Sequence, residues 1–205
     1  MNAEEERQTI QEARVDPRAF VGLYDHYFPR IHAYVRYRVF RPQDAEDIIA
    51  DVFLKAMRRI GRFEWRHENS FAAWLFRIAH NMIVDYYRRY DGIELASIPD
   101  PALDSDGRRA TKGIGPATSR ARQPEDALTQ RETYRQMRAL ILTLSPRRQE
   151  VITLRFFGGL RNKEIALVLG LDERTIASHL SRGLQDLRKR YSVRTRSRVL
   201  EEINL

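Results

Sequence analysis

The sequence predicts an all-α protein made of two small helical domains, joined by a long flexible linker, with a helix-turn-helix in the second domain. Apolar residues recur at steps of three and four on both sides of residues 91–128, which is the spacing of one helix face. Residues 91–128 themselves have no period and mix glycine, proline and charges of both signs. No stretch alternates as a strand does, and 205 residues are enough for two small domains.

Three helices are predicted for the first domain, residues 18–90. Residues 19–39 are expected to form an amphipathic helix, with a break near Pro29. Asp44 is expected to cap a second helix that Gly61 closes, and Ser70 is expected to cap a third that runs to Arg89. Residues 1–17 are left as an N-terminal extension.

The second domain, residues 129–191, begins with a helix and continues with another that Ser145 caps, with Pro146 at its first position. Gly170 then separates two short helices in the stretch EIALVLGLDERTIASHLSRGLQDLRKR. Residues 192–205 form a C-terminal tail that is basic and then amphipathic.

The charge of the chain favours a polyanionic partner. The formal net charge is +8, and most of the cations are arginines, which suit planar contacts to phosphates and bases. The N-terminus is acidic and polar, unlike a signal peptide, and no apolar run reaches the ~18 residues of a membrane span. We therefore expect a soluble, cytoplasmic protein without membrane insertion, and the absence of cysteine fits a reducing compartment.

The last helix of the second domain has two distinct faces. Ile176, Leu180, Leu184 and Leu187 share one narrow sector, which packs inward in a helix-turn-helix. The opposite side carries polar and basic residues that read base edges in a major groove: Arg174, Ser178, Ser181, Arg182 and Gln185. The competing interpretation is an ordinary helical hairpin whose charged side meets water.

The helix predicted for residues 70–89 also has a polar face of a particular kind. Arg77, Asn81 and Arg88 form a stripe flanked by His80 and Tyr87. Flat rings, amides and guanidinium groups together are what single-stranded nucleic acid recognition uses. The competing interpretation is a core helix with a few aromatic residues at its surface.

Catalysis and metal binding have no motif in the sequence. There is no HExxH, no glycine loop that cradles phosphate and no Ser/His/Asp signature, and His67 and Glu68 do not share a helix face. We expect a protein that is not an enzyme, with no metal and no cofactor.

Two blocks of sequence stand in a fixed order along the chain. The first holds DAEDIIADVFLKAM and FAAWLFRIAHNMIVDYYRR, and the second is LSPRRQEVITLRFFGGLRNKEIALVLGLDERTIASHLSRGLQDLRK. In this order they resemble the bacterial RNA polymerase sigma factors of the extracytoplasmic-function (ECF) type, in the sigma-70 superfamily. The resemblance covers nearly the whole chain outside the linker and the termini.

This resemblance implies a function and assigns residues to it. A sigma factor binds core RNA polymerase, recognises the −10 and −35 promoter elements and promotes DNA melting to initiate transcription. The clamp of the largest polymerase subunits would contact Asp47, Asp51, Phe53 and Leu54. The −10 element would contact the loop at residues 64–69, where Trp65 is a better stacking candidate than Trp74, together with Arg77, His80, Asn81 and Arg88.

The resemblance places −35 recognition on the last helix, with base contacts from Arg174, Ser178 and Arg182 and nearby contacts from Ser181 and Gln185. Phosphates would be held by Arg147, Arg148, Arg161 and Lys163. Promoter DNA and an anti-sigma protein are the further partners that it implies. The alternative is a helix-turn-helix regulator that binds duplex DNA without polymerase, which would leave the helix at residues 44–54 without a task.

Overall fold

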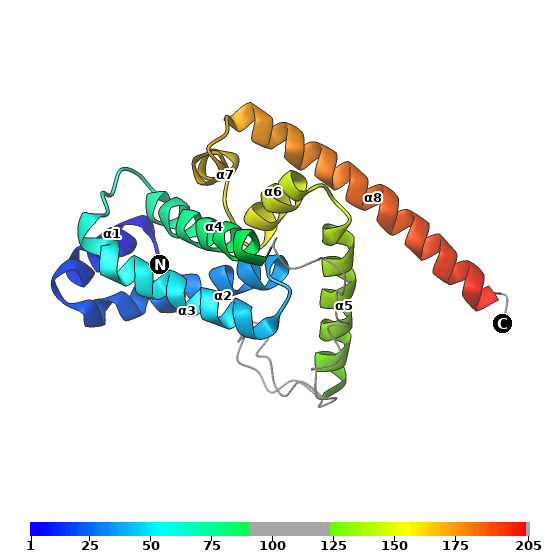
Figure 1. Ribbon diagram of the computed structural model, residues 1–205, viewed down its shortest axis with the longest axis horizontal. Helices are drawn as coiled ribbons and strands as arrows, with labels where there is room; N and C mark the ends of the chain where they lie inside the picture. The colour runs from blue at the N-terminus through cyan, green and yellow to red at the C-terminus, as the bar shows by residue number, and fades with distance from the viewer. Residues whose placement is uncertain (91–123, 204–205) are drawn as a thin grey trace.

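The computed structural model describes the backbone of residues 1–90 and 124–203 and the side chains of residues 1–89 and 133–192, and every element in these ranges is helical (Figure 1). The all-α prediction is confirmed. Residues 91–123 of the predicted linker lie outside the described residues, as do the tail side chains beyond residue 192. The domain boundaries drawn from the sequence stay predictions.

Four helices form a first helical body. They are α1 (Ala3–Val15), α2 (Phe20–Arg38), α3 (Pro42–Arg59) and α4 (Ser70–Tyr90), with short 3₁₀ turns at Pro17–Ala19 and Ile60–Arg62. Residues 1–17, which the sequence left without an element, therefore contain a helix. It packs through Ile10 and Ala13, both buried, because these residues lie three apart on one face of α1.

A second helical body holds α5 (Pro124–Leu142), α6 (Pro146–Phe156), α7 (Asn162–Leu169) and α8 (Glu173–Ile203). In Figure 1, α6 lies between α4 and α8, and the far end of α8 projects away from the other helices. Ser145 occupies the N-cap of α6 and Pro146 its first position, as predicted, although the Ser145 side chain makes no capping hydrogen bond.

Three local predictions for the first body were wrong. Helix α2 continues through Pro29 without a break. Helix α3 begins at Pro42, whose ring suits the first helical position, so Asp44 lies inside the first turn and accepts a hydrogen bond from Tyr86 at 2.7 Å. Ser70 is already helical, because the chain enters α4 through Asn69 in the left-handed region at φ 64°.

The larger of two apolar clusters among the described residues extends through both bodies. It includes Leu23, Ile31 and Phe76 of the first body and Leu154 and Ile165 of the second, all buried. The sequence did not predict that the two bodies share this core, because periodicity reports which face of a helix is apolar and not what covers it. The faces that carry the candidate sites are held relative to one another by this shared core.

Candidate nucleic-acid interface

The turn between α7 and α8 has helix-turn-helix geometry. Gly170 closes α7 in the left-handed region at φ 66°, and the backbone N–H of Leu171 donates to the Ala166 carbonyl at 3.1 Å. Asp172 accepts hydrogen bonds from the Thr175 backbone N–H at 2.8 Å and hydroxyl at 2.6 Å, and these bonds lower the pKa of this exposed carboxyl. The negative charge is thereby held at the start of α8.

Helix α8 turns its two faces as the sequence predicted. Ile176 is fully buried against α7, and Leu180, Leu184 and Leu187 are half-buried. All five of the predicted reading residues are exposed on the other side: Arg174, Ser178, Ser181, Arg182 and Gln185. This leaves a polar, cationic helix face of the kind that enters a major groove.

The four predicted phosphate contacts differ in their surroundings. Lys163 is exposed at the start of α7. Arg147 pairs with Glu150 at 2.8 Å within α6, and Arg148 pairs with Asp186, which fastens α6 to α8. Arg161 contacts Glu164 at 3.3 Å and reaches Glu68 of the first body at 3.7 Å. Arg161 therefore forms an ion pair between this set and the other body.

The polar stripe of α4 lies at the surface. Arg77, Asn81 and Arg88 are exposed, and Trp74, one turn before Arg77 on the same face, is half-buried. His80 does not belong to this stripe in the structure, because it faces α6 and lies 3.9 Å from the Glu150 carboxylate. Phe76 and Ile83 lie on the inner side of α4 and are buried.

The loop that precedes α4 carries Trp65 against α1. The indole is half-buried and packs on the core, and it lines a hollow of about 270 Å³ together with Arg7, Ile10, Gln11, Arg14 and Glu64. Phe63, at the start of the loop, lies 5.1 Å from Trp74 and 5.3 Å from Phe71 between ring centroids. Trp65 therefore packs on the core and also lines this hollow.

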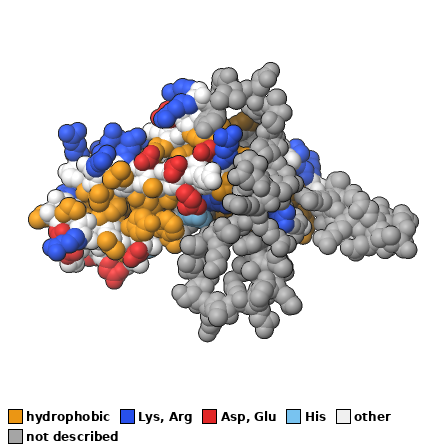
Figure 2. All heavy atoms as spheres, turned by 60° about the horizontal axis from the view of Figure 1, so that its bottom comes forward, with side chains coloured by type: hydrophobic (Ala, Val, Ile, Leu, Met, Phe, Trp, Pro, Cys, Tyr) orange, Lys and Arg blue, Asp and Glu red, His pale blue; other side chains and the backbone are white. Residues whose placement is uncertain are grey.

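The predicted polymerase contacts lie on α3. Asp47 and Asp51 are exposed and Leu54 is 38% exposed, next to Tyr24 and Met57, which are also partly exposed. In Figure 2, acidic side chains lie beside an apolar area on the half of the molecule formed by the first body. Phe53, which was predicted to contact the polymerase, is buried instead. Its side chain is 5% exposed and its ring centroid lies 4.7 Å from that of Tyr24, so Phe53 supports this surface from beneath.

The two bodies meet in an interface that the sequence did not predict. Arg30 of α2 donates to the Gly158 carbonyl at 2.8 Å, and Tyr37 stacks on Phe157 with 3.7 Å between ring centroids. A side chain on Gly158 would bring its Cβ within 2.6 Å of the Leu154 carbonyl oxygen and 3.0 Å of the Phe76 ring. The close approach of α4 and the loop after α6 thus needs glycine at this position.

A polar cluster lies beside this apolar contact. Arg38 reaches Glu150 at 3.4 Å, with both side chains 11% exposed, and Glu150 is the carboxylate that His80 and Arg147 also face. Burial lowers the pKa of His80, an effect that Arg38 and Arg147 reinforce and Glu150 opposes. Among the described side chains, the Tyr34 hydroxyl and Arg38 Nη1 are buried without hydrogen-bond partners. Such groups each cost about 1–3 kcal/mol, so this interface is less stable than its apolar part suggests.

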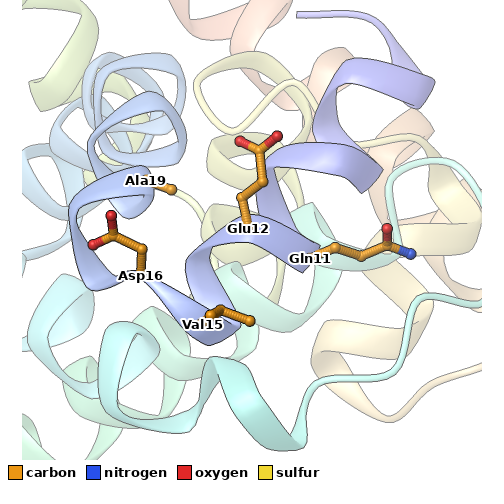
Figure 3. A pocket seen from close by; sticks show the side chains of 5 residues that line it. All are labelled: Gln11, Glu12, Val15, Asp16 and Ala19. Atoms are coloured by element: carbon orange, nitrogen blue, oxygen red, sulfur yellow. The ribbon is translucent and has the colours of Figure 1, made fainter.

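A hollow of about 550 Å³ at the end of α1 is lined by Gln11, Glu12, Val15, Asp16 and Ala19, whose side chains diverge (Figure 3). No group of three or more His, Cys, Asp or Glu in the described residues could hold a metal ion. Within the same residues, no helix has the length and apolar character that a membrane crossing requires.

Comparison with known families gives two matches in chain order. Residues 23–92 match the family described as Sigma-70 region 2, and residues 134–187 match Sigma-70, region 4. The first covers α4 and the α3 surface, and the second covers the helix-turn-helix.

Curated proteins similar to this chain carry related descriptions. It is 32% identical over 169 residues to the ECF RNA polymerase sigma factor BldN of Streptomyces coelicolor, which covers 82% of this chain and 59% of BldN. It is 29% identical over 181 residues to the RNA polymerase sigma factor YlaC of Bacillus subtilis, which covers 88% of this chain and 95% of YlaC. The chain thus spans about three fifths of one relative and nearly all of the other.

Two solved structures share the fold. One is CnrH in complex with the cytosolic domain of CnrY, with a TM-score of 0.65 and 21% identity over 91% of this chain and 97% of that one. The other is the sigma factor RpoE in complex with the anti-sigma factor NepR from Bartonella quintana, with a TM-score of 0.60 and 24% identity over 85% and 97%.

Proposed function

The chain belongs to the ECF group of the sigma-70 family of RNA polymerase sigma factors, and from this premise we propose that it binds core RNA polymerase, recognises −10 and −35 promoter elements and promotes the DNA melting that initiates transcription. One observation carries the proposal. The chain has two exposed nucleic-acid surfaces of different chemistry, a helix-turn-helix face on α8 and an aromatic, amide and guanidinium face on α4.

The α8 face suits duplex DNA. Arg174 and Arg182 read guanine through paired hydrogen bonds, and Ser178, Ser181 and Gln185 make the shorter-range contacts. Lys163 and Arg147 hold phosphates beside the recognition helix, since their side chains lie at the surface. Arg148 acts indirectly, because its pair with Asp186 orients α6 against α8.

The α4 face suits an unpaired strand. Arg77 and Arg88 hold the backbone, Asn81 reads a base edge and Trp65 stacks on a base. His80 joins them only after the second body has moved away from α4, because Glu150 now faces it.

Polymerase binding uses the α3 surface. Asp47 and Asp51 provide charge and Leu54 provides apolar contact, with Phe53 holding α3 against α2. The polymerase clamp is the partner in this proposal. The chain acts where polymerase and promoter DNA are, in the cytoplasm, as a recognition subunit without catalytic activity of its own.

Function requires the two bodies to separate. Promoter elements two helical turns apart lie about 70 Å from each other, whereas α4 and the loop after α6 are here in direct contact through Phe76 and Gly158. We therefore assign this arrangement to the free chain. An anti-sigma protein that binds across both bodies would favour it. Of the two solved structures that share the fold, RpoE is in complex with the anti-sigma factor NepR and CnrH with the cytosolic domain of CnrY.

Run-off transcription tests the proposal. Purified bacterial core polymerase is given fragmented genomic DNA with or without the chain, with an Asp51→Arg variant and with a Glu12→Arg control on the exposed side of α1. We expect discrete new start sites that Asp51→Arg abolishes and Glu12→Arg retains. If no start site appears, while the chain alone binds a duplex in a salt-dependent way, the proposal is wrong and the stand-alone regulator is correct.

A further inference from the structure

Helix α1 presents a polar stripe beside Trp65. Arg7, Gln11 and Arg14 are spaced by four and three residues, so they share one face, and all three are exposed. They line the hollow of about 270 Å³ into which Trp65 and Glu64 also face. A flat indole, an amide and two guanidinium groups therefore surround one concave space, and the amide and guanidinium groups come from α1, which precedes the family match at residues 23–92.

The stripe is held in a fixed position. Ile10 and Ala13 bury the inner face of α1, and the Tyr27 hydroxyl donates to the buried Glu6 carboxylate, whose pKa burial raises. The Arg14 guanidinium donates to the Phe63 carbonyl, two residues before Trp65. Since α1 and the loop are tied together at this point, the hollow is pre-formed and binding a ligand there orders little.

The acids near the stripe are largely engaged elsewhere. Glu5 caps the start of α1 through the Asn2 backbone N–H at 2.8 Å, and Glu12 accepts from Gln8 at 2.9 Å on the opposite side of the helix. Glu64 pairs with Arg66 at 3.4 Å. Within the part of the chain whose side chains are described, the Arg7 guanidinium makes no ion pair. Its charge faces solvent at the mouth of the hollow.

A chain of contacts leads from the hollow to the polar stripe of α4. Arg14 contacts the Phe63 carbonyl, the Phe63 ring lies 5.1 Å from Trp74, and Trp74 precedes Arg77 by one turn on the same face of α4. A strand that follows Asn81 and Arg77 toward the start of α4 would next meet Trp65 and then Arg7.

We propose that Arg7, Gln11 and Arg14, with Trp65, form a further binding site for single-stranded DNA, in which the guanidinium groups contact backbone phosphates and a base stacks on the indole. The site rests on the proposed function, since it receives the strand that melting exposes, and it extends the −10 surface from α4 onto α1. Arg14 has a second role as a positioning residue, because it holds the loop that carries Trp65.

Open-complex stability measured against salt tests this site. The full-length chain is assembled with core polymerase on a promoter fragment found by run-off transcription, and on the same fragment with its −10 element left unpaired. Arg7→Ala is compared with Arg18→Ala, a matched control whose side chain is 91% exposed and pairs with Asp16 outside the hollow. For one lost single-strand phosphate contact, we expect Arg7→Ala to reduce the slope of log affinity against log salt by about 0.7 on both templates. Arg18→Ala should leave the slope unchanged.

Trp65 provides the second arm of the test. Trp65→Ala should weaken the open complex roughly 5- to 150-fold, the range for loss of one stacked base, and Trp65→Phe should recover much of the affinity. Thermal unfolding identifies any Trp65 variant that is less stable than the wild-type chain. For such a variant, the salt slope of Arg7→Ala is the measurement that tests the site. The inference is overturned if the wild-type chain forms open complexes and Arg7→Ala matches Arg18→Ala. If the wild-type chain forms none, the proposed function itself is wrong and this site falls with it.

Discussion

Replacing Glu150 by alanine should open the contact between the two helical bodies. Glu150 lies on α6, where its carboxylate faces Arg38 of α2 at 3.4 Å and Arg147 of its own helix at 2.8 Å. The pair with Arg147 survives separation of the bodies, because both residues belong to α6. The pair with Arg38 exists only while the bodies are in contact.

The magnitude follows from the burial of Arg38. Its side chain is 11% exposed in the closed arrangement, and removing one partner of a buried ion pair costs about 3–5 kcal/mol. We use the lower end of this range, about 3 kcal/mol, because one nitrogen of the Arg38 guanidinium already has no hydrogen-bond partner among the described residues. Separation returns Arg38 to water and removes the cost, so Glu150→Ala should shift the equilibrium toward the open form roughly 100-fold.

Energy transfer between two dyes measures this equilibrium. The chain has no cysteine, so Arg58→Cys on α3 and Arg188→Cys on α8, both exposed, place one label on each body. Glu150→Ala should lower the transfer efficiency without changing the helical content, and Glu173→Ala, an exposed acid on α8, should leave the efficiency at the wild-type value. Unchanged efficiency in a folded Glu150→Ala variant would refute the reasoning.

The same labelled chain should open on acidification, because burial holds the pKa of His80 below its ordinary value. The closed form is therefore fully stable above about pH 6.5 and becomes less stable as pH falls toward the lowered pKa. His80→Gln should remove that part of the pH dependence of transfer, and its persistence would assign the effect to another group. Gly170→Ala should lower the free energy of unfolding by about 1–2 kcal/mol, because a Cβ strains the left-handed backbone although it meets no neighbour within 4 Å. Denaturant titration of Gly170→Ala beside Gly170→Asn measures the difference in unfolding free energy. Phe53→Ala should lower the free energy of unfolding by about 3–5 kcal/mol in the same titration. Leu54→Ala should leave the stability nearly unchanged and weaken polymerase binding, and equal stabilities of the two variants would contradict the burial of Phe53. Arg182→Ala should weaken holoenzyme binding to the −35 element by about 1–3 kcal/mol and relax its base preference, as measured by competition with mutated duplexes.

Local sequence determined the helices and the faces they present. The step of three and four residues from Ile176 to Leu187 was enough to place Arg182 outward on α8, and Gly170 was enough to end α7, because both depend on residues within one or two helical turns. The same reasoning failed at Pro29, which α2 accommodates in its interior through the packing of its neighbours.

Only the tertiary structure decided which surfaces remain available. Phe53 and Leu54 are adjacent in sequence and equally apolar, yet one is buried against Tyr24 and the other is exposed. His80 falls beside the polar stripe of α4 by sequence, yet it faces Glu150, seventy residues further along the chain. These outcomes depend on contacts between residues far apart in the chain, and a periodic pattern records only that a face must be covered, not which partner covers it.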